Sequence, residues 1–153
     1  MRTWPIQLPG PINYRAWQPD PAVLARIDAL VLSIEDVRGD EALALSYTKH
    51  CRLVVVTRGP LGATLYLEGQ PHQVSAFPAA ERDPTGAGDV FAATLITRLH
   101  ETGDPLAAAH FAAFVAARSI EGVGVSSLPS RAVIDASVAA ATAPGQARSA
   151  GSI

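Results

Sequence analysis

The fold of this chain is decided by the stretch Asp83-Pro84-Thr85-Gly86-Ala87-Gly88-Asp89-Val90-Phe91, which sets two glycines directly before an apolar run compatible with a helix. Glycines let backbone N–H groups approach an anion closely, and the N-terminus of a helix adds the positive end of its dipole. Asp89 falls in the first turn of that expected helix. An anion cradle with a carboxylate beside it is the equipment for phosphoryl transfer to a hydroxyl group.

The structural alternative for this stretch is a capped junction between a loop and a helix. In that interpretation Thr85 or Asp83 caps the helix and the glycines are spacers. The flanking residues favour a functional site, because Asp83, Thr85 and Asp89 all present oxygen atoms around the same backbone and Phe91 can anchor the helix below it. We therefore predict an anion-binding turn here.

Strands and helices alternate along the rest of the chain. Strands are expected at residues 29–32, 52–57, 63–67 and 73–77, the last two as a hairpin around a turn at 68–71. Helices are expected from the Asp20-Pro21 start and at residues 40–50, 90–101, 106–121 and 131–141. This order predicts an α/β fold, with a parallel-centred sheet and helices on both faces. Ligands bind such sheets beyond the carboxyl ends of the strands, where the loops after Leu32, Thr57 and Phe77 would gather.

Composition restricts the class of protein. The 153 residues are enough for one domain or part of a larger one, and we expect a domain over 1–143 followed by a flexible tail at 144–153. A net charge of −2 gives no case for nucleic acid or an anionic membrane as partner. The lone Cys51 is predicted to be a buried structural thiol. No long apolar run or targeting segment is evident, so a cytoplasmic location is expected.

Several segments together resemble the ribokinase-type (PfkB) carbohydrate kinases. Residues 83–91 resemble the C-terminal signature of that family, and residues 55–62 resemble its strand and glycine turn at the nucleotide. Residues 13–17 and 126–129 resemble the segments that come before and after these two, in the family's order and spacing. The resemblance implies a three-layer α/β/α, Rossmann-like sheet, truncated here to the C-terminal, nucleotide-binding half.

The resemblance also implies roles for the residues of the glycine turn. Asp89 would be the general base that takes the proton from the substrate hydroxyl as it attacks the γ-phosphate of ATP. The N–H groups of Gly86, Ala87 and Gly88 would form the anion hole for the transferring phosphoryl group. These roles suit the chemistry, because phosphoryl transfer depends mainly on positioning and charge stabilisation.

Nucleotide and cation sites are implied in the same way. Thr57, Gly59 and Gly62, together with Gly88, would line the nucleotide. Asp83 and Thr85 would help to hold a monovalent cation such as K⁺, with carbonyl groups from residues 122–126.

A Mg²⁺ site is implied at residues 33–36, where the family carries Asn-x-x-Glu. Here Ser33 and Asp36 stand in those places, and Asp36 keeps the hard oxygen that Mg²⁺ prefers. Glu35 is an alternative to Asp36. The structural alternative is a capping box in which Ser33 begins a helix and Asp36 lies three residues further on.

Family members are about twice as long, and the half that supplies the sugar-binding face and a small lid would precede Asn13. We therefore expect substrate binding to be impaired and an exposed sheet edge to be covered by a second copy or another partner. The leading interpretation is an ATP-dependent kinase acting on a sugar or polyol, with a cyclic polyol as one option. A non-catalytic nucleotide-binding or regulatory module is the second. A dinucleotide-binding Rossmann domain is disfavoured, because no Gly-x-Gly-x-x-Gly follows a first strand.

Overall fold

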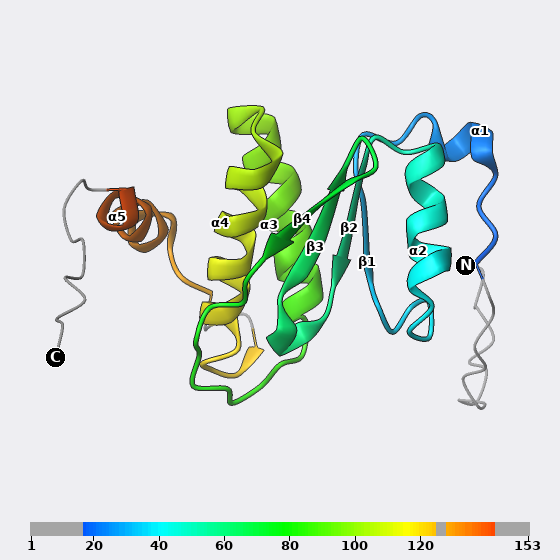
Figure 1. Ribbon diagram of the computed structural model, residues 1–153. Coiled ribbons are helices and arrows are strands. Elements are labelled where there is room, and N and C mark those ends of the chain that lie inside the picture. The colour runs from blue at the N-terminus through cyan, green and yellow to red at the C-terminus, as the bar shows by residue number, and fades with distance from the viewer. Residues whose placement is uncertain (1–16, 125–127, 143–153) are drawn as a thin grey trace, which may run out of the picture.

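The computed structural model describes residues 17–124 and 128–142, so most of the 13–17 segment, residues 126–127 and the expected tail at 144–153 lie outside the described part. A four-stranded sheet separates α1 and α2 on one face from α3 and α4 on the other (Figure 1). The strands are β1 (Leu30–Ser33), β2 (Leu53–Thr57), β3 (Ala63–Leu67) and β4 (Gln70–Val74). The helices are α1 (Pro21–Leu24), α2 (Glu41–Ser46), α3 (Ala87–Thr102), α4 (Pro105–Ser119) and α5 (Arg131–Thr142), with short 3-10 turns at Tyr47–Lys49 and Gly59–Leu61. The expected three-layer α/β/α arrangement is confirmed.

The sheet is mixed, and this corrects the expected parallel centre. Its order is β1-β2-β3-β4, with β1 parallel to β2, β2 antiparallel to β3 and β3 antiparallel to β4. Two successive reversals make β4 run in the same direction as β1 and β2. The carboxyl ends of these three strands therefore meet at one edge, as the sequence predicted for the loops that follow them.

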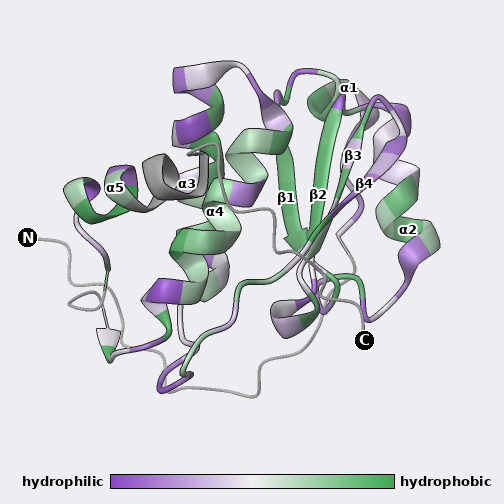
Figure 2. Ribbon diagram, turned by 60° about the vertical axis from the view of Figure 1, so that its left-hand side comes forward, coloured by the Kyte–Doolittle hydropathy of each residue, from purple (hydrophilic) through white to green (hydrophobic). Residues whose placement is uncertain are grey.

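The hairpin between β3 and β4 is tighter than expected, so β4 spans Gln70–Val74 and not 73–77. Glu68 and Gly69 both have positive φ, 52° and 81°, which is the geometry of a two-residue hairpin turn. Leu67 therefore pairs directly with Gln70. Pro71 is tolerated inside β4 because this strand lies at the edge of the sheet. Figure 2 shows β4 as mostly hydrophilic, in contrast to the hydrophobic β1 and β2.

Alternation along β2 builds a core on each face of the sheet. Val55 is fully buried toward α3 and α4, where it joins Leu65, Phe91 and Leu95. The other face of β2 buries Val54 and Val56 against α1 and α2, among residues that include Leu24, Ala44, Tyr47 and Cys51. Each fully buried aliphatic side chain of this kind contributes about 1.5–3 kcal/mol to folding. The prediction that Cys51 is a buried free thiol is confirmed.

N-cap residues determine where the helices begin. Asp20, Asp40 and Asp104 cap α1, α2 and α4, each by accepting a hydrogen bond from a backbone N–H in the first turn. The helix α3 begins at Ala87, three residues before the expected start at Val90, because Gly86 acts as its N-cap. No helix among residues 17–124 and 128–142 is long and apolar enough to cross a membrane.

Candidate active site

The N-terminus of α3 is left open by the residues that precede it. Its N-cap, Gly86, lies in the left-handed region with φ 81°, and no side chain caps the helix. The carboxylate of Asp83 instead accepts the N–H of Thr85 at 3.0 Å, within the turn. The predicted structural alternative, a helix capped by Thr85 or Asp83, is therefore wrong, and the positive end of the α3 dipole faces outward.

The backbone N–H groups of this turn are not all equally available. Ala87 donates its N–H to the carbonyl of Pro84 at 3.1 Å, and Val90 makes the first helical bond, to Gly86, at 2.9 Å. Among the described residues, the N–H groups of Gly86 and Gly88 have no acceptor. Of the three N–H groups expected to form the anion hole, those of Gly86 and Gly88 are therefore free, and that of Ala87 stabilises the turn.

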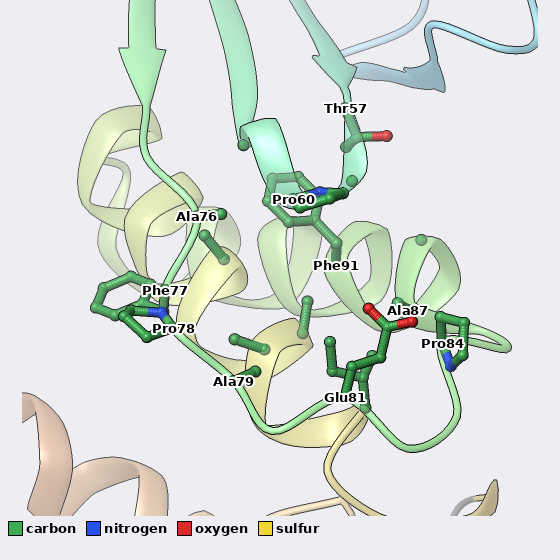
Figure 3. Close-up of a pocket in the computed structure, with 17 residues that line it drawn as sticks. Thr57, Pro60, Ala76, Phe77, Pro78, Ala79, Glu81, Pro84, Ala87 and Phe91 are labelled. Carbon is green, nitrogen blue, oxygen red and sulfur yellow. The ribbon is translucent and has the colours of Figure 1, made fainter.

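A cavity of about 460 Å³ opens beside this helix end. Figure 3 shows Ala87 and Pro84 on one side of it, Phe77 and Pro78 on the opposite side, and Thr57 and Pro60 between them. Its size falls within the range of about 300–1,000 Å³ that is typical of small-molecule sites. The cavity brings the two glycine turns of the sequence together, since Thr57, Gly59, Gly62, Ala87 and Gly88 all line it.

The glycine turn after β2 is held close to the strand β4. Gly62 is buried, has φ 86°, and lies so near β4 that an added Cβ would meet the carbonyl oxygen of Val74 and lie 2.9 Å from the N of Ala76. Gly59 also has positive φ, 55°, but an added Cβ would have no atom within 4 Å. Close packing therefore requires glycine at position 62, whereas position 59 has open space next to the cavity.

Asp89 lies where the sequence placed it, in the first turn of α3. Its side chain is exposed and has no hydrogen bond or ion pair with any described residue. Asp89 and Gly86 do not line the cavity themselves, but each is adjacent in sequence to a residue that does. The carboxylate is thus exposed and unpaired next to Gly88, which lines the cavity.

The turn before Gly86 is tied to the end of α4. Arg82 and Asp83 donate their N–H groups to the carbonyl of Ile120, at 2.8 and 3.2 Å. Hydrogen bonds from the hydroxyl and then the N–H of Thr85, and to a lesser degree from the N–H of Gly124, hold the pKa of Asp83 below its ordinary value of 3.8. Asp83 therefore lies beside Gly124, while residues 125–126, which were also implied for the cation site, lie outside the described part.

Replacing Thr85 with Val removes the largest of those interactions and is expected to raise the pKa of Asp83 toward 3.8. Because the folded-state pKa is the lower one, the stability that this carboxylate contributes is complete above pH 3.8 and is lost as the pH falls through the folded pKa. In the variant this contribution is smaller, and its loss is complete at a higher pH than in the unaltered protein. Carboxyl-carbon NMR titration of both proteins measures the pKa directly, and equal values would refute the assignment.

The residues implied for Mg²⁺ lie at the end of β1, outside the cavity lining. Asp36 accepts the N–H of Ser33 at 2.8 Å, and the Ser33 hydroxyl accepts the N–H of Glu35 at 3.2 Å. The first of these contacts is one of the two that define the predicted capping box, but a turn and not a helix follows Ser33. The Glu35 carboxylate is exposed and has no partner among the described residues, so it fits a water-mediated cation better than Asp36 does.

One wall of the cavity includes the loop after Phe77, which the sequence placed at this edge of the sheet without identifying the residues that line the cavity. The segment between β4 and α3 contributes Phe77, Pro78, Ala79 and Glu81. The C-terminal part of α4 and its C-cap residue contribute Ala113, Ala116, Ala117 and Ile120. Arg118 of α4 donates to the carbonyl of Pro78, and the rings of Phe77 and Phe114 meet edge-on at 5.5 Å. The proline and small residues that follow a polar edge strand were the signal available in the sequence. Glu81 is the one charged side chain lining the cavity among the described residues.

Comparison with known proteins places these features in a family. A family model described as pfkB family carbohydrate kinase matches residues 28–131, more than half of the chain. The chain is 40% identical over 72 residues to inositol 3-kinase from Oryza sativa subsp. japonica, covering 47% of this chain and 18% of that enzyme.

Solved structures agree with this match. The ribokinase from Thermotoga maritima has a TM-score of 0.70 at 23% identity, over 78% of this chain and 44% of that one. The Arabidopsis thaliana ribokinase complexed with ribose and ATP has a TM-score of 0.66 at 26% identity, over 76% of this chain and 42% of that one. The chain thus spans less than half the length of these relatives. It belongs to the pfkB family of carbohydrate kinases.

Proposed function

We propose that this chain carries the nucleotide-binding part and the catalytic base of an ATP-dependent kinase that phosphorylates a hydroxyl group of a sugar or polyol. The observation that carries the proposal is the uncapped N-terminus of α3, which opens beside a cavity that is also lined by the Thr57–Gly62 turn. An open helix end binds an anion, and the apolar cavity next to it has room for the rest of a nucleotide.

Within this proposal each group has a defined task. The free N–H groups of Gly86 and Gly88 stabilise charge on the transferring phosphoryl group. Thr57, Gly59 and Gly62 border the nucleotide from the opposite turn. The exposed Asp89 carboxylate accepts the proton of the attacking hydroxyl, which requires no rearrangement because no other described residue occupies it.

Two cations complete the proposal. A Mg²⁺ bound with ATP would neutralise phosphate charge, and the carboxylates of Glu35 and Asp36 would orient its water ligands from the end of β1. A K⁺ would be held by oxygen atoms of Asp83 and Thr85. The fit of Asp83 is partial, since its carboxylate already accepts hydrogen bonds from Thr85 and Gly124.

A cyclic polyol is the acceptor that we favour. The support is the similarity to the inositol 3-kinase of Oryza sativa, at 40% identity over 72 residues. A second candidate function is nucleotide binding without catalysis, which would use the same cavity and the same two glycine turns.

The experiment that tests the function is ATP consumption over a panel of inositol, ribose, fructose and a nucleoside, alongside calorimetric titration with Mg-ATP. Turnover with one acceptor supports the kinase. Binding of ATP without turnover across the panel supports the non-catalytic module. Absence of both binding and turnover would refute the proposal.

We also propose that the free edge of β1 is covered by a second copy or by a partner. Among the described strands β1 pairs with β2 alone, and its residues Leu30 and Val31 are half-buried. Unpaired strand edges with apolar neighbours promote association. Size-exclusion chromatography with light scattering is therefore expected to give a mass above that of the 15.9 kDa monomer at micromolar concentration. A stable monomer over that range would contradict the proposal.

A further inference from the structure

Arg58 lies inside the proposed nucleotide turn, but its side chain leaves the cavity. The side chain is 17% exposed and lines a separate polar hollow with Glu41, Thr64 and Gln73, none of which lines the cavity. The neighbours of Arg58 in sequence, Thr57 and Gly59, both line the cavity. One residue therefore connects the nucleotide turn to the opposite side of the sheet.

The guanidinium group of Arg58 joins three elements. Its Nε and Nη2 atoms donate to the Glu41 carboxylate in the first turn of α2, at 3.1 Å and 2.8 Å. Its Nη1 donates to the Thr64 hydroxyl on β3 at 2.7 Å and to the Val56 carbonyl on β2 at 3.3 Å. A planar guanidinium held by a two-oxygen carboxylate contact and two further acceptors has little freedom to rotate.

A second ion pair at the other end of β2 provides a contrast. Arg52 contacts Glu68 through a single Nε bond at 3.0 Å, and these side chains are 74% and 66% exposed. Exposed pairs of this kind contribute little to stability, because water and salt screen them. The Arg58 network is the one that is built into the fold.

The backbone of the turn is bonded to Arg58 as well. The N–H of Arg58 donates to the carbonyl of Gly62 at 2.7 Å, and the carbonyl of Arg58 accepts from Leu61 at 3.1 Å. Gly62 is in turn packed beneath β4. The turn is thus fixed from two sides, by Gly62 against β4 and by the Arg58 side chain against α2 and β3.

We propose that Arg58 and Glu41 act as positioning residues, holding the Thr57–Gly62 turn in the geometry that a nucleotide phosphate or ribose requires. The inference rests on the proposed nucleotide binding at this cavity. Neither the Glu41 carboxylate nor the Arg58 guanidinium lines the cavity. Their effect is to keep the turn in its binding-competent conformation, so that binding free energy is not spent on ordering it.

The test compares Arg58→Met, which keeps the length of the side chain, and Glu41→Gln, which changes a residue remote from the cavity. Arg52→Met, at the opposite end of β2, is the matched control. Hydrogen exchange of the amides of Arg58, Leu61 and Gly62 is expected to accelerate in Arg58→Met and remain unchanged in the control. The dissociation constant for ATP is expected to rise about tenfold in Arg58→Met, which corresponds to a competent fraction of about one tenth.

A fourth variant, Val54→Ala, distinguishes a general loss of stability from a specific effect on the turn. It removes side-chain volume from the core on the α2 side and leaves the turn residues unchanged. This variant is expected to lower the melting temperature but leave ATP affinity unchanged. If amide exchange is faster in Arg58→Met but the protein binds no ATP, Arg58 does hold the turn and the proposed nucleotide binding is refuted. If amide exchange and ATP affinity are both unchanged in Arg58→Met and in Glu41→Gln, the positioning role of these residues is refuted.

Discussion

Replacing Asp89 with Asn is expected to lower the rate of phosphoryl transfer by about 10²–10⁴-fold, the range that a positioned general base contributes. Asparagine keeps the shape of the side chain but cannot accept the proton of the attacking hydroxyl. The exposed carboxylate makes no contact with another described residue, so the substitution breaks no internal bond. The measurement is kcat for the acceptor that supports turnover, with ATP binding followed separately by calorimetry.

The expected pattern is loss of kcat with ATP affinity retained. Stability should change by about 0.3–1 kcal/mol, since a negative charge is removed from the first turn of α3. Asp28→Asn is the matched control, because Asp28 is also exposed and has no partner among the described residues. Full activity in Asp89→Asn would show that another group takes the proton.

The elements that could be predicted from sequence are those with strong local signals. Aspartates before Pro21 and Pro105 marked two helix starts, and the Val-rich run at 53–57 marked the central strand. Pairing of strands was harder, because the difference between a four-residue and a two-residue turn depends on whether Glu68 adopts positive φ. That choice depends on the twist of the strands that the turn connects, and a single residue type does not reveal it.

In the candidate site, too, features with a local sequence signal could be predicted, whereas features that depend on distant contacts could not. The two glycine turns could be located because glycine patterns are local, and the parallel direction of β1, β2 and β4 then brings the ends of their strands to one edge. The loop after Phe77 was expected at this edge, but its contacts with α4 and the Arg58 network could not be predicted, because both depend on contacts between distant segments. Arg58 stands between Thr57 and Gly59 with no local signal of a role, and its bonds to α2 form only once the chain is folded.

Replacing Gly62 with Ala is expected to be the most damaging single change to the fold near the cavity. Residue 62 has φ 86° and ψ −141°, a backbone conformation that an L-residue adopts at a cost of about 1–3 kcal/mol. The new Cβ would also collide with the Val74 carbonyl, and overpacking of this kind costs about 1–3 kcal/mol more. For a domain of this size we expect the melting temperature to fall by about 5–20 °C.

Gly59→Ala is the control that separates close packing from backbone strain. Position 59 also has positive φ, 55°, but an added Cβ meets no atom within 4 Å, so the backbone term of about 1 kcal/mol is the whole expected cost. Both variants are compared by thermal unfolding and by ATP titration. If Gly62→Ala lost no more stability than Gly59→Ala, the contact with β4 would yield easily, and the turn would not be held against that strand. The Arg58 network holds only the other side of this turn. Equal losses of stability in Gly62→Ala and Gly59→Ala would therefore indicate that the turn is not rigid before a nucleotide binds.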